Sequence, residues 1–141
     1  MEWFLLAILS AFFAALVSIL AKIGLQGVDS TVATAVRAII MALFTVIFAI
    51  STGKGPQLTQ SSSKHVGFII LSGIAGALSW LCYFAALKLA DASKVAPVDR
   101  ASVLIVMVAA ALFLGERITL KTAVAGFFVF VGLLLFAIKL D

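Results

Sequence analysis

The fold is restricted most by long apolar runs, each about as long as a lipid bilayer is thick. The first run extends from Trp3 to Ala21 and contains no charged residue. A helix needs about 20 apolar residues to cross a hydrocarbon core of roughly 30 Å. In lipid only helices and closed barrels satisfy their backbone hydrogen bonds, and the runs show no strand-like alternation. Because Glu2 stands where a signal peptide carries basic residues, we interpret the run as a retained membrane-spanning helix.

Composition supports the same fold class for the whole chain. Of the 141 residues, 65% are hydrophobic and 11% are charged, against about 45–50% and about 25% in soluble domains. A soluble globule of this size cannot bury so many apolar side chains, so lipid must surround most of them. Polar connectors separate the apolar runs. We therefore expect an all-α integral membrane protein, one domain over residues 1–141, with five helices at about 3–21, 31–50, 66–87, 95–114 and 122–138.

Charge does not favour one orientation of these helices. Single lysines and arginines flank the apolar runs, a pattern of membrane-flanking charges that does not indicate nucleic-acid binding. One side of the membrane receives Lys54, Lys64, Arg117 and Lys121. The other receives Lys22, Lys88, Lys94 and Lys139. Equal counts allow insertion in both orientations, which would build an inverted repeat from two copies, or in one orientation set by the depth of each charge.

The last third of the chain carries a family resemblance. Its features are the "AL" end of a helix at Ala86-Leu87, a connector of small residues at residues 90–93, a proline early in the next helix, and "FLGERIT" at residues 113–119. With Arg37 in the second helix, this pattern resembles the EamA family of the drug/metabolite transporter superfamily. Most members carry two five-helix units, so the resemblance implies a homodimer that supplies the second half of a ten-helix inverted-repeat transporter. It further implies an antiparallel arrangement, as in small multidrug resistance transporters, and a bacterial or archaeal plasma membrane.

One departure from the small multidrug resistance transporters concerns proton coupling. Those proteins carry a membrane-embedded glutamate in the first helix, whereas Glu2 of this chain lies at the membrane surface. The resemblance therefore does not extend to proton coupling through the first helix.

Arg37 is the first candidate for a binding site. It lies about 9 Å below the start of its helix at 1.5 Å per residue. Charges within a span are costly and usually face an interior cavity or a partner. Helical spacing puts Thr34, Met41 and Thr45 on the same face. The alternative is that the long side chain extends to the head groups, and both interpretations are open.

The third and fourth helices supply the other candidates. In the third, one stripe contains Gly73, Gly76, Ala77, Trp80, Tyr83 and Phe84. We expect the glycines to pack against a neighbouring helix and Trp80 to form a cavity wall, while Tyr83 lines that cavity or anchors near the interface. In the fourth, Pro97 at the first helical position would place Asp99 in the first turn, where the helix dipole favours a carboxylate. Arg100 points roughly 100° away from Asp99 and must meet head groups, a carboxylate or an anionic substrate.

These residues predict a small secondary transporter or exporter of a metabolite. The expected substrate contacts are Arg37, Trp80, Tyr83, Asp99 and Arg100. His65, the only histidine, has no second ligand at metal spacing, so no metal or cofactor is expected. No nucleophile is paired with a base, so the sequence does not indicate an enzyme. The alternative function is a non-transporting membrane subunit that packs against a larger partner.

Overall fold

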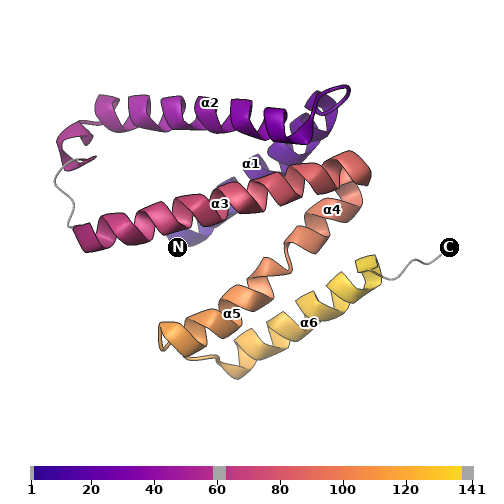
Figure 1. The fold of residues 1–141 in the computed structure, drawn as a ribbon. Helices are drawn as coiled ribbons and strands as arrows, with labels where there is room; N and C mark the ends of the chain where they lie inside the picture. The colour runs from indigo at the N-terminus through magenta and orange to yellow at the C-terminus, as the bar shows by residue number, and fades with distance from the viewer. Residues whose placement is uncertain (1, 59–62, 138–141) are drawn as a thin grey trace. The chain divides into compact units, whose positions relative to one another are not determined.

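Helices account for nearly all of the structure, which is a computed structural model described for residues 2–58 and 63–137 (Figure 1). The elements are α1 (Glu2–Gly24), α2 (Ser30–Ser51), the 3-10 turn η1 (Gly55–Leu58), α3 (Ser63–Leu89), α4 (Ala92–Asp99), α5 (Ser102–Phe113) and α6 (Leu120–Ala137). The described residues contain no strand. The chain divides into two compact units, one of residues 20–89 and one of residues 1–19 with 90–141.

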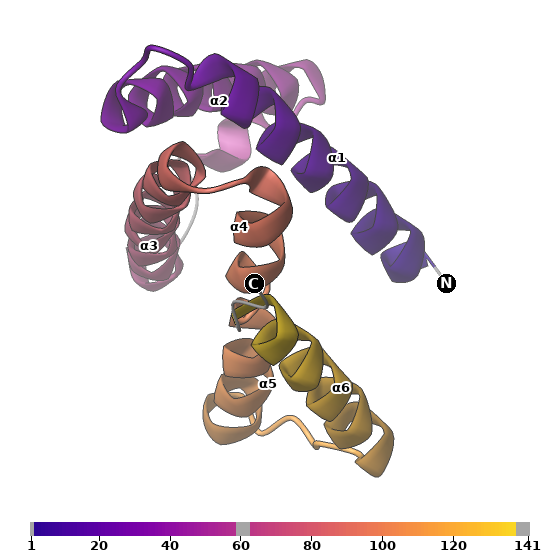
Figure 2. The same cartoon turned by 90° about the vertical axis from the view of Figure 1, so that its right-hand side faces the viewer.

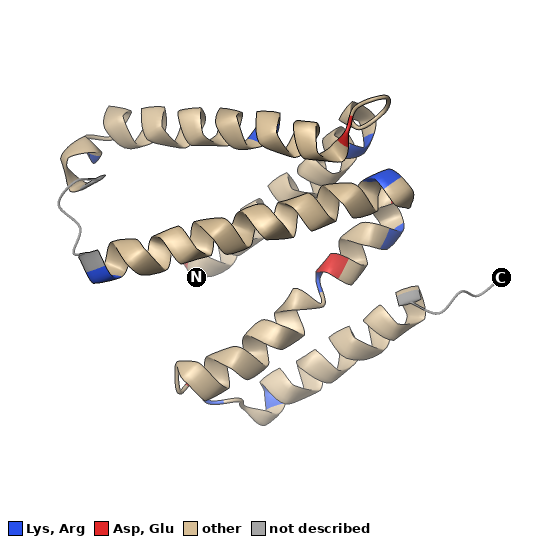
Figure 3. Cartoon of the chain, in the orientation of Figure 1, with Lys and Arg blue, Asp and Glu red and all other residues tan. Residues whose placement is uncertain are grey.

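The helices have the length and hydropathy of membrane spans. In the described part of the chain, four stretches are long and apolar enough to cross a membrane: Glu2–Gly24, Ser30–Ser51, Lys64–Leu89 and Ala92–Phe113. A shorter apolar helix covers Leu120–Phe136. The expected end of the last helix at residue 138, and Lys139 beyond it, lie outside the described residues. Charged residues gather towards helix ends (Figure 3), and large apolar side chains along the helices are exposed. The chain is therefore an all-helical integral membrane protein.

In the unit of residues 20–89, two lysines join the α1–α2 connection to the end of α3. Lys22 Nζ donates to the Leu87 carbonyl at 2.6 Å, and Lys88 Nζ donates to the Val28 carbonyl at 3.0 Å. A cation near the C-terminal carbonyls of a helix also interacts favourably with the helix dipole. The two bonds hold the start of α2 beside the end of α3, and these two helices pack against each other.

The start of α2 is fixed by an acidic cap. The Asp29 carboxylate accepts hydrogen bonds from the backbone N–H groups of Thr31 at 2.8 Å and Val32 at 3.3 Å. Such a cap satisfies N–H groups that have no partner within the helix. The same bonds hold the pKa of the Asp29 carboxyl below its ordinary value.

In the other unit, the fourth span is a broken helix, visible where α4 meets α5 (Figure 1). Figure 2 shows α5 and α6 of this unit side by side. Arg100 N–H donates to the Pro97 carbonyl and Ala101 N–H to the Val98 carbonyl, which are three-residue rather than four-residue steps. The helix begins at Ala92, after an extended Asp91, so the expected first position for Pro97 is wrong. Pro97 lies inside α4, where it removes one helix hydrogen bond. Asp99 is consequently the last residue of α4, and its expected place in a first turn is also wrong.

The same unit is closed by α6, which packs against α4 and α5. Gly126 of α6 lies directly against the side chain of Met107 of α5. A Cβ added there would lie 2.8 Å from Met107 Cε and 3.3 Å from its sulfur. The absence of a side chain at residue 126 therefore makes room for Met107.

Candidate functional site

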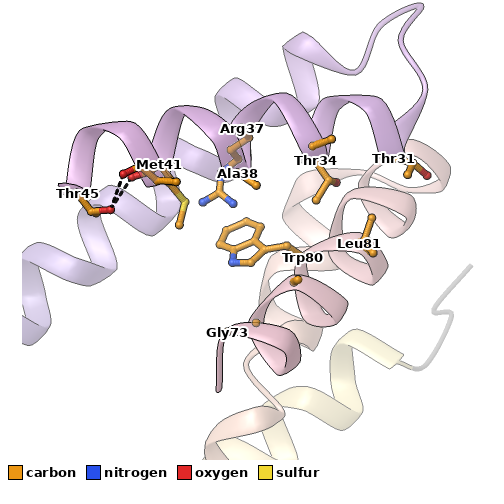
Figure 4. Close-up of a pocket in the computed structure, with 13 residues that line it drawn as sticks. Thr31, Thr34, Arg37, Ala38, Met41, Thr45, Gly73, Trp80 and Leu81 are labelled. Atoms are coloured by element: carbon orange, nitrogen blue, oxygen red, sulfur yellow. Dashed lines mark hydrogen bonds between the residues drawn. The ribbon is translucent and has the colours of Figure 1, made fainter. Parts of the chain in front are cut away.

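The central feature of the site is an arginine stacked on a tryptophan (Figure 4). Arg37, within α2, places its guanidinium Cζ 3.5 Å from the centroid of the Trp80 ring on α3. The Phe84 ring, one turn further along α3, lies 5.7 Å from the same atom. A guanidinium over an aromatic face is attracted by the negative charge of the ring face. The sequence left open whether Arg37 faces the protein interior or extends to the head groups. In the structure its side chain points towards α3.

Beside this pair, α2 and α3 line an open pocket with a volume of about 650 Å³. Its lining from α2 consists of Thr31, Thr34, Ala35, Arg37, Ala38, Met41, Ala42 and Thr45. Its lining from α3 consists of Gly73, Gly76, Ala77, Trp80 and Leu81. Thr34, Met41 and Thr45 therefore share the face of Arg37, as helical spacing predicts. The whole pocket belongs to the unit of residues 20–89.

The polar groups of the pocket differ in what they can offer a ligand. Thr34 Oγ1 donates to the Ser30 carbonyl at 2.7 Å, and Thr45 Oγ1 donates to the Met41 carbonyl at 2.8 Å (Figure 4). Since these hydroxyl protons are used within α2, the two oxygens present lone pairs and act as acceptors. The Arg37 guanidinium makes no ion pair or hydrogen bond with any residue in 2–58 or 63–137. It is thus the strongest donor available to a ligand in this pocket.

The glycines of α3 widen the pocket. A Cβ added to Gly73 or Gly76 would meet no atom within 4 Å. The helix packing expected at these glycines is therefore not present among the described residues. Instead, their missing side chains leave space beside Trp80.

The remaining predicted residues occupy other positions. Tyr83 is buried and meets Trp80 edge-on, with ring centroids 5.5 Å apart, but it does not line the pocket. Asp99 and Arg100 belong to the other unit and are exposed. The lining residues that sequence reasoning missed are Thr31, Ala35, Ala38, Ala42 and Leu81. Their signal is helical spacing, since Ala38 is four residues from Thr34 and Leu81 is four residues from Ala77.

Comparison with known proteins decides the family. The profile of the EamA-like transporter family matches residues 1–138. The chain belongs to this EamA-like transporter family. It is also similar to an uncharacterized transporter in the cobO 3' region of Sinorhizobium sp., with 38% identity over 137 residues and 97% of each chain covered. No solved structure matches the chain. Family and relative support a transporter role and point away from an enzyme.

Proposed function

We propose that this EamA-like chain is a secondary transporter of a small organic anion, which binds in the α2–α3 pocket. One observation carries the proposal: the Arg37 guanidinium lies over Trp80 beside the pocket and has no anionic partner in the described part of the chain. An unpaired charge within a span is costly, and an anionic ligand would offset that cost. Hydrogen bonds from guanidinium to carboxylate are stronger than neutral ones.

The shape of the pocket supports a compact ligand with an apolar body. Its volume of about 650 Å³ falls in the usual range for small-molecule sites, about 300–1,000 Å³. Apart from Arg37 and the threonines, aliphatic side chains, a methionine and an aromatic ring line it. In this proposal Arg37 binds the anionic group and Trp80 contacts the apolar body of the substrate. Tyr83 packs against the Trp80 ring and helps to hold it in position. Substrate contacts for Asp99 and Arg100 stay predictions.

The assembly we propose is a homodimer that works by alternating access. One chain supplies five helices, and a second copy, antiparallel to the first, would supply the other half of an inverted-repeat transporter. The two halves would then expose the substrate site to either side of the membrane in turn. We assign the protein to the plasma membrane of a bacterium or archaeon, which its similarity to a Sinorhizobium protein supports.

A binding experiment tests the anion preference. Benzenesulfonate and benzoate should raise the melting temperature of the purified protein, because a ligand of the folded state stabilises it. Benzyl alcohol and benzyltrimethylammonium, which have the same ring without the anion, should not. Arg37→Gln should lose the shift, with affinity falling roughly 10- to 100-fold for a lost hydrogen bond to a charged group of about 1.5–3 kcal/mol. Arg117→Gln, a surface arginine outside the pocket, serves as the matched control.

A flux experiment separates the transporter from the alternative of a non-transporting subunit. Liposomes containing the protein should exchange radiolabelled benzenesulfonate across the bilayer, and Arg37→Leu should abolish that exchange. If the wild type binds no anion and moves none, or if the Arg37 variants match it, the proposed function is wrong and the subunit interpretation gains support.

A further inference from the structure

The unit of residues 1–19 and 90–141 carries a groove that the proposed function does not use. It is open, lies along α5 and α6, and has a volume of about 520 Å³. Six residues of α5 between Leu104 and Phe113 line it together with Phe130 of α6, and every one of these side chains is apolar. Because polar groups without partners are costly in apolar surroundings, the part of a ligand that lies in this groove must itself be apolar.

The groove is about as long as one leaflet of a bilayer is thick. Its lining on α5 extends from Leu104 to Phe113, which is roughly 13 Å at 1.5 Å per residue. Half of a hydrocarbon core of roughly 30 Å is roughly 15 Å. Phe113 ends the fourth span, Ala92–Phe113, and Leu104 lies near the middle of that span. The groove therefore covers the depth that the acyl chains of one leaflet occupy.

The connection from α5 to α6 folds back against the end of α5. Leu114 N–H and Glu116 N–H both donate to the Ala110 carbonyl, at 3.0 Å and 3.2 Å. Gly115 between them has a φ of +69°, the left-handed conformation in which many helices end. These bonds hold Glu116 close to the last turn of α5, and Arg117 follows it directly. The polar residues of the connection thus lie at the end of the groove that is nearest the membrane surface.

Two cations belong to this end of the groove. Arg117 is in the connection and Lys121 is in the first turn of α6. Figure 3 shows basic residues in these two segments. Neither cation makes an ion pair with any residue in 2–58 or 63–137. Glu116 offsets one of the two charges, and the start of α6 adds the partial positive charge of a helix end. The end of the groove is therefore positive and favours an anion.

We propose that the α5–α6 groove binds an anionic phospholipid, with one acyl chain along the apolar lining and the phosphate beside Arg117 and Lys121. The apolar lining and the positive end together match a molecule that has an apolar chain and an anionic head. Lysine and arginine next to the membrane surface attract anionic lipids. Contacts along the groove add dispersion attraction for the chain. The inference does not depend on the proposed transport function, and its measurement needs no transported substrate.

Native mass spectrometry of the full-length protein in detergent tests the head-group preference. Dioleoylphosphatidylglycerol and dioleoylphosphatidylcholine, which share their chains and differ in head-group charge, are added in equal amounts. The wild type should retain more phosphatidylglycerol. Arg117→Gln with Lys121→Gln should lower this preference by about 5-fold for each cation removed. Lys54→Gln with Lys64→Gln, the same loss of charge away from the groove, should leave it unchanged. Equal retention of both lipids by the wild type, or an unchanged preference in the first double variant, would overturn the proposal.

A second pair of variants tests the groove itself. Val108→Trp places a large side chain in the middle of the lining, whereas Val106→Trp places the same side chain on an exposed part of α5 outside it. Both should keep the melting temperature of the wild type, and only Val108→Trp should lose phosphatidylglycerol. Equal retention by the two variants would contradict a lipid in the groove. If Val108→Trp separated a dimer into monomers without changing lipid retention, the groove would be a contact between copies, and the proposal would be wrong.

Discussion

Arg37 and Trp80 illustrate how a costly residue is accommodated inside an apolar helix. The side chain of Arg37 is partly covered by two aromatic rings of α3, at 3.5 Å and 5.7 Å from its guanidinium carbon. A cation over a ring contributes about 0.5–1 kcal/mol when exposed and about 2 kcal/mol when desolvated. The ring thus orients the guanidinium, while its N–H groups stay available to an anion.

The aromatic face of Trp80 should matter more than the indole itself. Trp80→Ala removes the surface under Arg37 and should weaken benzenesulfonate binding by about 0.5–2 kcal/mol, or roughly 2- to 30-fold. Trp80→Phe keeps an aromatic face and should retain most of the affinity. Calorimetric titration of both variants measures the difference. Equal losses in both would argue against the stacked arrangement.

The pocket can be blocked without disturbing the helix that forms it. Gly76→Leu places a side chain in space where no atom lies within 4 Å of a Cβ. Replacing a helical glycine should stabilise the fold by about 0.5–1 kcal/mol. The variant should therefore keep or slightly raise its melting temperature but lose benzenesulfonate binding.

Gly67→Leu is the control for this change, because Gly67 is also in α3 with free space around it but lies outside the pocket lining. It should bind benzenesulfonate as the wild type does. If both leucine variants bind equally well, the pocket between α2 and α3 is not the anion site.

At the scale of single helices, the cap of α2 predicts a pH dependence. Backbone N–H donors from Thr31 and Val32 lower the pKa of Asp29 in the folded state. The ionised cap therefore stabilises the fold above the ordinary aspartate pKa of about 3.9, and this contribution is lost as the pH falls through the lower folded-state pKa.

Asp29→Asn isolates that contribution, since asparagine also caps a helix but does not titrate. The melting temperature of the wild type should exceed that of the variant near neutral pH, and the difference should shrink below about pH 4. Melting curves over a pH series measure it. A difference that does not change with pH would mean that the charge of Asp29 is irrelevant to the cap.

The contact between α5 and α6 predicts a graded response at Gly126. Gly126→Ala should be tolerated, because the methyl end of Met107 can move aside from the added Cβ. Gly126→Ile should cost about 1–3 kcal/mol by overpacking. Met107→Ala in the same chain should recover part of that loss by making room, as thermal unfolding can show. If the effects of Gly126→Ile and Met107→Ala on the free energy of unfolding were simply additive, residues 107 and 126 would not be in direct contact.

Element boundaries show where sequence reasoning reached its limit. Proline early in an apolar run predicts a helix start, because proline lacks an N–H and suits the first turn. In the structure Asp91 precedes the helix, and α4 includes Pro97. The preference of Pro97 for a first helical turn was thus outweighed by the hydrogen bonds of the neighbouring backbone. As a result, Asp99 lies at the end of α4 and not in its first turn.

At the scale of the molecule, equal numbers of flanking cations allow insertion in both orientations, and a reporter experiment separates this from insertion in one orientation. Two reporters are fused in turn to the C-terminus, one active only in the cytoplasm and the other active only on the opposite side of the membrane. If the chain inserts in both orientations, both reporters should give signal in the wild type. Arg117→Gln with Lys121→Gln removes two positive charges from one side and should shift the population to the orientation with the other side cytoplasmic. Signal from one reporter alone in the wild type would require a parallel dimer or a separate partner.

Hydropathy and helical spacing predicted the apolar spans and the face of α2 that carries Arg37. Both patterns act within about 20 neighbouring residues, and hydrocarbon leaves the backbone few alternatives. The three-dimensional structure was needed to show that Arg37 lies over Trp80, that Gly73 and Gly76 open a pocket, and that Asp99 ends a half-helix. The Arg37–Trp80 stack and the pocket depend on residues that are distant in the chain. The break depends on which backbone hydrogen bonds form around Pro97. Local sequence patterns predict none of these three features.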